Sequence, residues 1–144
     1  MRTTTVGTTI VGLIALLAAA AGAGGTGTIT VVAIGAASER GTVLIQLANS
    51  AADYGNEKGG FRSAEIKPAG GRVTATFEDV PYGDYAVKVF HDENDNKKID
   101  IGLRGPKERY GFSNGARGLF GPPSFSDAKV ALTTPELQLE IALK

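Results

Sequence analysis

The chain has no cysteine, no tryptophan and a single histidine among its 144 residues. The lack of cysteine excludes disulfides, thiolate zinc sites, thiol nucleophiles and the acylated N-terminal cysteine of lipoproteins. A zinc site built on His91 would find no second histidine or cysteine as a ligand. An excess of either charge is lacking too, because 15 basic side chains stand against 15 acidic ones. A neutral chain has no long-range field that concentrates nucleic acid, so we expect no nucleic-acid partner.

The N-terminus carries the pattern of an export signal. Arg2 precedes an uncharged stretch, residues 6–23, that is rich in Ala, Leu, Ile and Gly and ends in small residues. This order is typical of a secretory signal peptide, so we predict cleavage near Ala23, with earlier sites at 18–21. The alternative is a retained membrane anchor, for which the stretch is short against a hydrocarbon core of roughly 30 Å. We therefore expect an exported protein, periplasmic or extracellular, with one domain over 24–144 and no membrane span after cleavage.

Beyond this segment the dominant hydrophobic period is two. Apolar and polar residues alternate in seven runs, at 28–33, 42–47, 62–67, 72–77, 84–89, 128–132 and 136–144. Such alternation predicts antiparallel strands with one face on a core and one in water. Gly- and Pro-containing turns separate the runs, and no amphipathic helix of useful length is present. The pattern predicts an all-β fold, an immunoglobulin-like or transthyretin-like antiparallel sandwich of about seven strands with one long ordered loop, 92–125.

Two local features refine this prediction. The turn at 81–83 delivers Tyr85 onto the core face at the start of a strand. Its hydroxyl is placed to reach back to the backbone, as in the tyrosine corner of Greek-key sandwiches. Ser50, followed by Ala51, Ala52 and Asp53, predicts the cap of a single helical turn.

The start of the long loop resembles a calcium-binding sequence. Side-chain oxygens at alternate positions, with a backbone carbonyl between them, suit a cation that takes six to eight oxygen ligands. The candidate ligands are Asp92, Asn94, Asn96, the Lys98 carbonyl and Asp100. Two positions depart from the usual pattern, because Lys97 replaces the turn glycine and Leu103 replaces the bidentate glutamate, although Glu108 offers a later carboxylate. The alternative is a solvated polar turn that binds no metal.

The rest of the loop suggests a rim at one end of the sandwich. Alternation places His91 on the core face at the end of its strand, either as a rim histidine bonded to loop backbone or as a catalytic base. The candidate ligand-contacting residues are His91, Arg109, Tyr110, Phe112, Asn114, Arg117 and Phe120. Aromatic rings interleaved with Arg and Gly can form a stacking platform. Alternatively, the aromatic residues fold inward as a satellite core that caps the sandwich.

Four segments carry a resemblance to a bacterial family. They are residues 77–86, 89–94, 110–114 and 120–125, which recur in this order in the proteins of domain of unknown function 2141. The resemblance spans essentially the whole chain after the signal and implies export and a small β-sandwich, but no established activity. Many of these proteins have Gly in the loop where this chain has Asp95 and Lys97, a departure that bears on metal binding.

These observations leave three hypotheses for function. The first is a non-enzymatic binding or structural module of the bacterial envelope, with a protein or saccharide partner and a loop ordered by Ca²⁺. The second is a small periplasmic hydrolase or lyase that uses His91 with Asp92 or Glu108. The third is a structural domain whose loop is only a lid on the core. Since no nucleophile signature surrounds any serine of the loop, we assign no catalytic residue.

Overall fold

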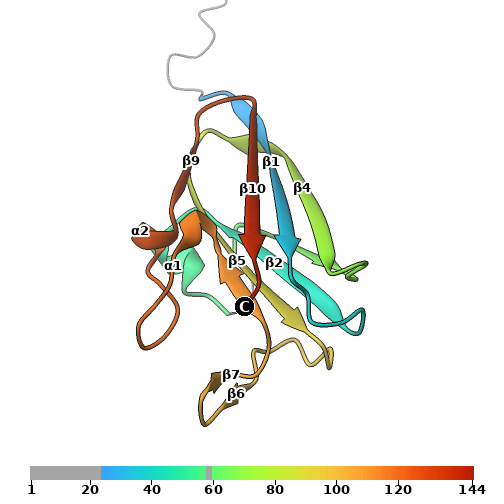
Figure 1. Cartoon of the computed structure of the whole chain (residues 1–144). Helices are drawn as coiled ribbons and strands as arrows, with labels where there is room; N and C mark the ends of the chain where they lie inside the picture. The colour runs from blue at the N-terminus through green and yellow to red at the C-terminus, as the bar shows by residue number, and fades with distance from the viewer. Residues whose placement is uncertain (1–23, 58–59) are drawn as a thin grey trace, which may run out of the picture.

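The structure of the protein, a computed structural model, describes residues 24–57 and 60–144. The predicted signal peptide, residues 1–23, lies outside the described residues. Two sheets form the body of the domain (Figure 1). The first has the order β10-β1-β4 and comprises β1 (Thr26–Ile34), β4 (Arg72–Pro81) and β10 (Glu136–Ala142).

The second sheet runs in the order β3-β2-β5-β8, and β9 pairs with the start of β5. Its strands are β2 (Thr42–Ala48), β3 (Arg62–Ile66), β5 (Gly83–Asp92), β8 (Tyr110–Phe112) and β9 (Val130–Leu132). A separate hairpin joins β6 (Ile101–Gly102) to β7 (Gly105–Pro106). The short helices are α1 (Ala51–Tyr54), η1 (Ser113–Gly115) and α2 (Phe125–Ala128). No helix in these described ranges is long and apolar enough to cross a membrane.

The alternating residues pack between the sheets, which confirms an all-β fold. Buried side chains of both sheets form one cluster: Ile29, Val31, Ala33, Val43, Ile45, Leu47, Val73, Ala75, Phe77, Val80, Tyr85, Val87, Val89, Leu132, Ile141 and Leu143. At roughly 25 cal/mol per Å² of apolar area removed from water, this burial is the main stabilising contribution. Every member lies between residues 29 and 143, so the chain from Gly24 onward contains the whole described core.

Both local predictions are confirmed. The Tyr85 hydroxyl donates to the Pro81 carbonyl at 2.7 Å, and its ring is buried in the core. The Ser50 side chain accepts the Asp53 backbone N–H and caps α1. The Ser50 bond satisfies one of the N–H groups that the first turn of a helix leaves unpaired.

Three features differ from the sequence-based expectation. β1 pairs with β10 in parallel, so the first sheet is mixed rather than antiparallel. Residues 92–125 do not form one loop without strands, because β6, β7 and β8 lie within them and β8 joins the second sheet. The sixth run begins only at Val130, since Ala128 ends the turn of helix α2. Short pairings of two or three residues carry too little periodicity to be recognised in sequence.

A second, smaller core lies beside the first. Ala48, Tyr54, Ala86 and Ala128 are buried together, with Phe112, Ala116 and Phe125 packed against them. The rings of Tyr54 and Phe125 meet edge to face, with centroids 6.1 Å apart. The predicted satellite core is therefore correct for Phe112 and Phe125, but Phe120 stands away from it, at 104% relative exposure.

Candidate functional site

His91 lies at the end of β5 and is fully buried. Its Nδ1 accepts the Ala37 backbone N–H at 3.1 Å, and its Nε2 lies 2.7 Å from the Arg40 carbonyl oxygen. Because Nδ1 accepts a hydrogen bond and Nε2 faces a carbonyl oxygen, which can only accept, the proton of the neutral ring is on Nε2. Both ring nitrogens are thus used to hold the 35–41 segment against β5. This is the rim histidine bonded to loop backbone, one of the two expected roles.

Asp92, the next residue, is also fully buried and organises the start of the loop. Its Oδ1 accepts the Asn96 backbone N–H at 3.2 Å, and its Oδ2 accepts the Lys97 N–H at 2.7 Å. The loop turns through left-handed conformations at Asp95 (φ 54°) and Lys97 (φ 64°). The backbone therefore makes the sharp turn that glycine favours, although neither residue is glycine.

The predicted metal ligands gather around Asp100. The side-chain amides of Asn94 and Asn96 donate to its carboxylate at 2.8 to 3.1 Å, and the Lys98 N–H donates to Asn96 Oδ1 at 3.0 Å. These side chains therefore converge in one tight loop. In this arrangement, however, amide nitrogens rather than oxygens meet Asp100. Within 24–57 and 60–144, no three acidic or histidine side chains are grouped to hold a metal ion.

Glu108 completes this cluster from a distance of eight residues along the chain. Its side chain is buried, and its Oε2 accepts the Asp100 backbone N–H at 3.2 Å. Its Oε1 is buried and receives no hydrogen bond. Burial raises the pKa of this carboxyl, and the nearby Asp92 and Asp100 carboxylates raise it further, while the bond from Asp100 N–H opposes the rise. A buried carboxylate oxygen without a hydrogen-bond partner is costly, and this cost favours the protonated form of the Glu108 carboxyl.

A small hollow opens beside Glu108. Its volume is about 240 Å³, and its lining residues are Arg40, Glu93, Asn94, Asp100, Lys107 and Glu108. Four of these six residues bring side-chain oxygens, and two bring cations. We define residues 92–100 together with Glu108 as the acidic loop.

The aromatic and basic candidates do not converge on one pocket. Tyr110 and Phe112 lie on β8, and their rings are 5.7 Å apart, edge to face. Arg109 donates from its guanidinium to the Gly35 carbonyl at 2.9 Å. Tyr110 and Phe112 are both half-buried, so their rings pack within the domain and are only partly available as a stacking platform for a ligand.

The remaining candidates lie further along the chain. Asn114 adopts φ 58° in η1, and its amide donates to the Asp127 carbonyl at 2.9 Å, tying η1 to α2. Arg117 and Phe120 are exposed in the loop that precedes α2. The structure therefore separates the seven predicted rim residues: it buries His91, half-buries two on β8 and leaves four exposed, namely Arg109, Asn114, Arg117 and Phe120.

Sequence reasoning missed Ser113, the most buried hydroxyl of this region. Its Oγ accepts the Val87 N–H at 2.8 Å and donates to the Ala128 carbonyl. It continues the pairing of β5 at the point where β8 ends and before β9 begins. Its position directly after the Tyr-Gly-Phe segment of β8 was the only available signal.

The second missed feature is a pair of exposed apolar tips. Leu103 is 108% exposed at the turn of the β6–β7 hairpin, and Leu119 and Phe120 are 94% and 104% exposed in the loop before α2. Figure 1 shows both segments projecting away from the sheets at the lower left, the hairpin lowest. Together with Ile99 and Ile101, these are the exposed large hydrophobic side chains of the described residues, and all five lie in 99–120.

A family model described as uncharacterized proteins conserved in bacteria (DUF2141) matches residues 31–140. The matched span runs from β1 to β10, so it includes both sheets, the acidic loop and both exposed tips. No curated protein and no solved structure matches the chain.

Proposed function

We propose a function for this chain, which belongs to the bacterial DUF2141 family. It is a non-enzymatic binding module of the cell envelope, and Ca²⁺ orders its acidic loop. The observation that carries the proposal is the environment of Glu108. Its Oε1 is buried and receives no hydrogen bond, and the carboxylates of Asp92 and Asp100 lie nearby. The proposal has three parts, the lack of catalysis, the cation and the location, and each has its own support.

A binding role is favoured over hydrolysis because of how His91 and Asp92 are used. A general base needs a free nitrogen within reach of a substrate proton, and both nitrogens of His91 are bonded to backbone groups. Asp92 is bonded to two backbone N–H groups of its own loop. Ser113, the buried serine nearby, is bonded on both sides to backbone as well.

The acidic loop offers Ca²⁺ a donor set once its side chains rearrange, because no three acidic side chains in the described part of the chain are already grouped around a metal position. Asp92, Asp100 and Glu108 supply carboxylate oxygens, and Asn94 and Asn96 supply amide oxygens once their amides rotate by half a turn. This rotation would break the bonds that Asn94 Oδ1 and Asn96 Oδ1 now accept from backbone N–H groups, and would replace the amide N–H groups that meet Asp100 with oxygen ligands, of which Ca²⁺ takes six to eight. A cation bound there would also satisfy the orphaned Oε1.

Thermal unfolding of residues 24–144 tests the cation. We expect millimolar Ca²⁺ to raise the Tm above its value in EDTA, and Mg²⁺ to raise it less. At about 100 times its Kd, a ligand specific to the folded state contributes roughly 2.7 kcal/mol, or several degrees for a domain of this size. Glu108→Gln keeps the shape of the side chain and should abolish most of the calcium shift. Glu93→Gln, a carboxylate at the same end outside the donor set, should retain it.

The two variants also make the result decisive. A wild-type Tm that does not respond to Ca²⁺ would remove the cation from the proposal. An equal calcium shift in wild type and Glu108→Gln would mean that calcium acts elsewhere. In EDTA, Glu108→Gln should itself be more stable than wild type. The neutral amide removes a buried carboxylate oxygen that has no hydrogen-bond partner and puts a donor group near the Asp92 and Asp100 carboxylates.

The envelope location is supported by the N-terminal pattern alone and is tested separately. We expect cell fractionation to recover the protein outside the cytosol, with a mature N-terminus near residue 24. Cytosolic protein that retains Arg2 would contradict export. We further infer that the domain groups with immunoglobulin-like or transthyretin-like sandwiches, an assignment supported by the tyrosine corner at Tyr85 and tested by an experimental structure.

A further inference from the structure

We infer that the β6–β7 hairpin and the loop before α2 dock the protein onto anionic phospholipid bilayers, by inserting Leu103, Leu119 and Phe120 among the headgroups while neighbouring cations meet lipid phosphates. This deepens the proposed function, because it names the surface and the partner of the binding module. It does not depend on the calcium site. We define the tips as residues 101–107 and 115–123.

The exposure of the tips is built into their backbone. In the hairpin, Ile101 pairs with Pro106 and Gly102 with Gly105, so Leu103 and Arg104 form the two-residue turn. Such turns usually carry Gly, Asn, Asp or Pro. Leu103 is fully exposed there, so its side chain adds no packing to the stability of the fold. In the second tip a Cβ on Gly118 would lie 1.6 Å from the Gly121 carbonyl oxygen. Only glycine permits this closure, and it leaves Leu119 and Phe120 at the apex.

The charge of the tips selects the kind of surface. Every charged residue in the two segments is a cation: Arg104, Lys107 and Arg117. Lys107 also lines the hollow with the carboxylates of Asp100 and Glu108, so we assign the lipid-phosphate contacts to Arg104 and Arg117. Apolar side chains surrounded by cations suit the boundary of an anionic bilayer, where acyl chains accept the apolar groups and phosphates pair with the cations.

The shape of the tips also favours a bilayer over a protein partner. Two narrow projections with one or two apolar side chains each do not form the flat, contiguous patch of about 800 Å² per side that a standard protein interface buries. A bilayer is deformable and accepts separate wedges. An exported domain would meet such a surface, although the docking itself follows from the tips.

Flotation with vesicles tests the inference, using residues 24–144 so that the N-terminal apolar stretch does not contribute. We expect binding to vesicles of phosphatidylcholine with phosphatidylglycerol, little binding to phosphatidylcholine alone, and loss of binding at high salt. Phe120→Ser together with Leu119→Ser should lower the partition coefficient about tenfold or more. Arg104→Gln and Arg117→Gln should each lower it about fivefold.

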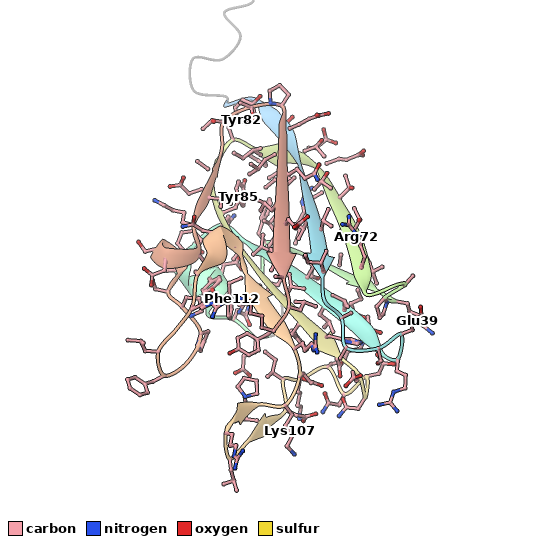
Figure 2. All side chains as sticks on the ribbon, in the orientation of Figure 1. Glu39, Arg72, Tyr82, Tyr85, Lys107 and Phe112 are labelled. Carbon is pink, nitrogen blue, oxygen red and sulfur yellow. The ribbon has the colours of Figure 1, made fainter. Side chains whose placement is uncertain are left out.

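Matched controls come from exposed cations elsewhere. Arg72, at the start of β4, lies higher and further to the right than Lys107 in Figure 2, away from the lower end of the molecule. Arg72→Gln and Lys67→Gln should therefore leave binding unchanged. Because the tip side chains are fully exposed, their variants should unfold within about 0.5 kcal/mol of wild type.

Several outcomes would overturn the docking. They are no flotation with anionic vesicles, equal binding to neutral vesicles, and binding that the tip variants leave unchanged. Self-association that Leu119→Ser abolishes, without vesicle binding, would instead make a second copy of the chain the occupant. Running the flotation in EDTA and in Ca²⁺ separates the two proposals, since the calcium shift in Tm and the vesicle binding can each fail alone.

Discussion

Ser113→Ala removes a hydroxyl that satisfies two backbone groups at once. Ser113 is buried, accepts the Val87 N–H at 2.8 Å and donates to the Ala128 carbonyl. Alanine leaves both backbone groups buried without their partner. Each unsatisfied group costs about 1–3 kcal/mol, so we expect the free energy of unfolding to fall by about 3 kcal/mol.

Urea and thermal unfolding measure this loss. For a domain of this size about 3 kcal/mol corresponds to a drop of roughly 10 °C in Tm, with the urea midpoint lowered and the m-value unchanged. Ser126→Ala is the matched control, because Ser126 is exposed on α2, and it should change stability by less than about 0.5 kcal/mol. A loss below about 1 kcal/mol for Ser113→Ala would refute the role of the hydroxyl as the link between β8, β5 and α2.

Three further predictions rest on single side chains. Tyr85→Phe should lower the free energy of unfolding by about 1 kcal/mol, because it removes the hydrogen bond to Pro81. Tyr54→Phe should leave stability unchanged or raise it, because the Tyr54 hydroxyl is buried without a hydrogen bond. Urea unfolding measures both, and the opposite ranking would contradict this prediction. Lys97→Gly should be more stable than Lys97→Ala by about 1 kcal/mol, since φ is 64° there, and equal stabilities would mean that the turn is not strained. The raised pKa of Glu108 means that the folded state keeps this proton above the usual pKa of 4.5, so the associated stability is lost as pH rises through the folded pKa. In EDTA the stability advantage of Glu108→Gln over wild type should therefore grow from pH 4 to pH 7, and an advantage independent of pH would contradict the assignment.

The strands were predictable because alternation is a local signal. Runs such as 42–47 and 72–77 place apolar residues on one face whatever the neighbouring strand is, so these strands and their inward faces follow from sequence. The Tyr85 corner and the Ser50 cap were predictable for the same reason. Each joins residues that lie no more than four positions apart.

The candidate site was predictable only in part. The convergence of Asn94, Asn96 and Asp100 follows from their spacing in one tight loop. The buried ends of the network do not, because Glu108 reaches Asp100 across eight residues and His91 meets Arg40 across fifty-one positions. Nothing local marks such contacts.

By itself the sequence determined the all-β class, the strand faces and the composition of the acidic loop, since these depend on periodicity and on the chemistry of adjacent residues. Tertiary structure alone decided that β1 pairs in parallel with β10, that Ser113 links β8 to β5, and which apolar residues stay outside. Phe112 and Phe120 each have a glycine as one chain neighbour and lie eight positions apart. One packs on the second core, and the other is held at the apex of a turn closed by Gly118. Burial depends on which surfaces the fold brings together, and that is a property of the whole chain.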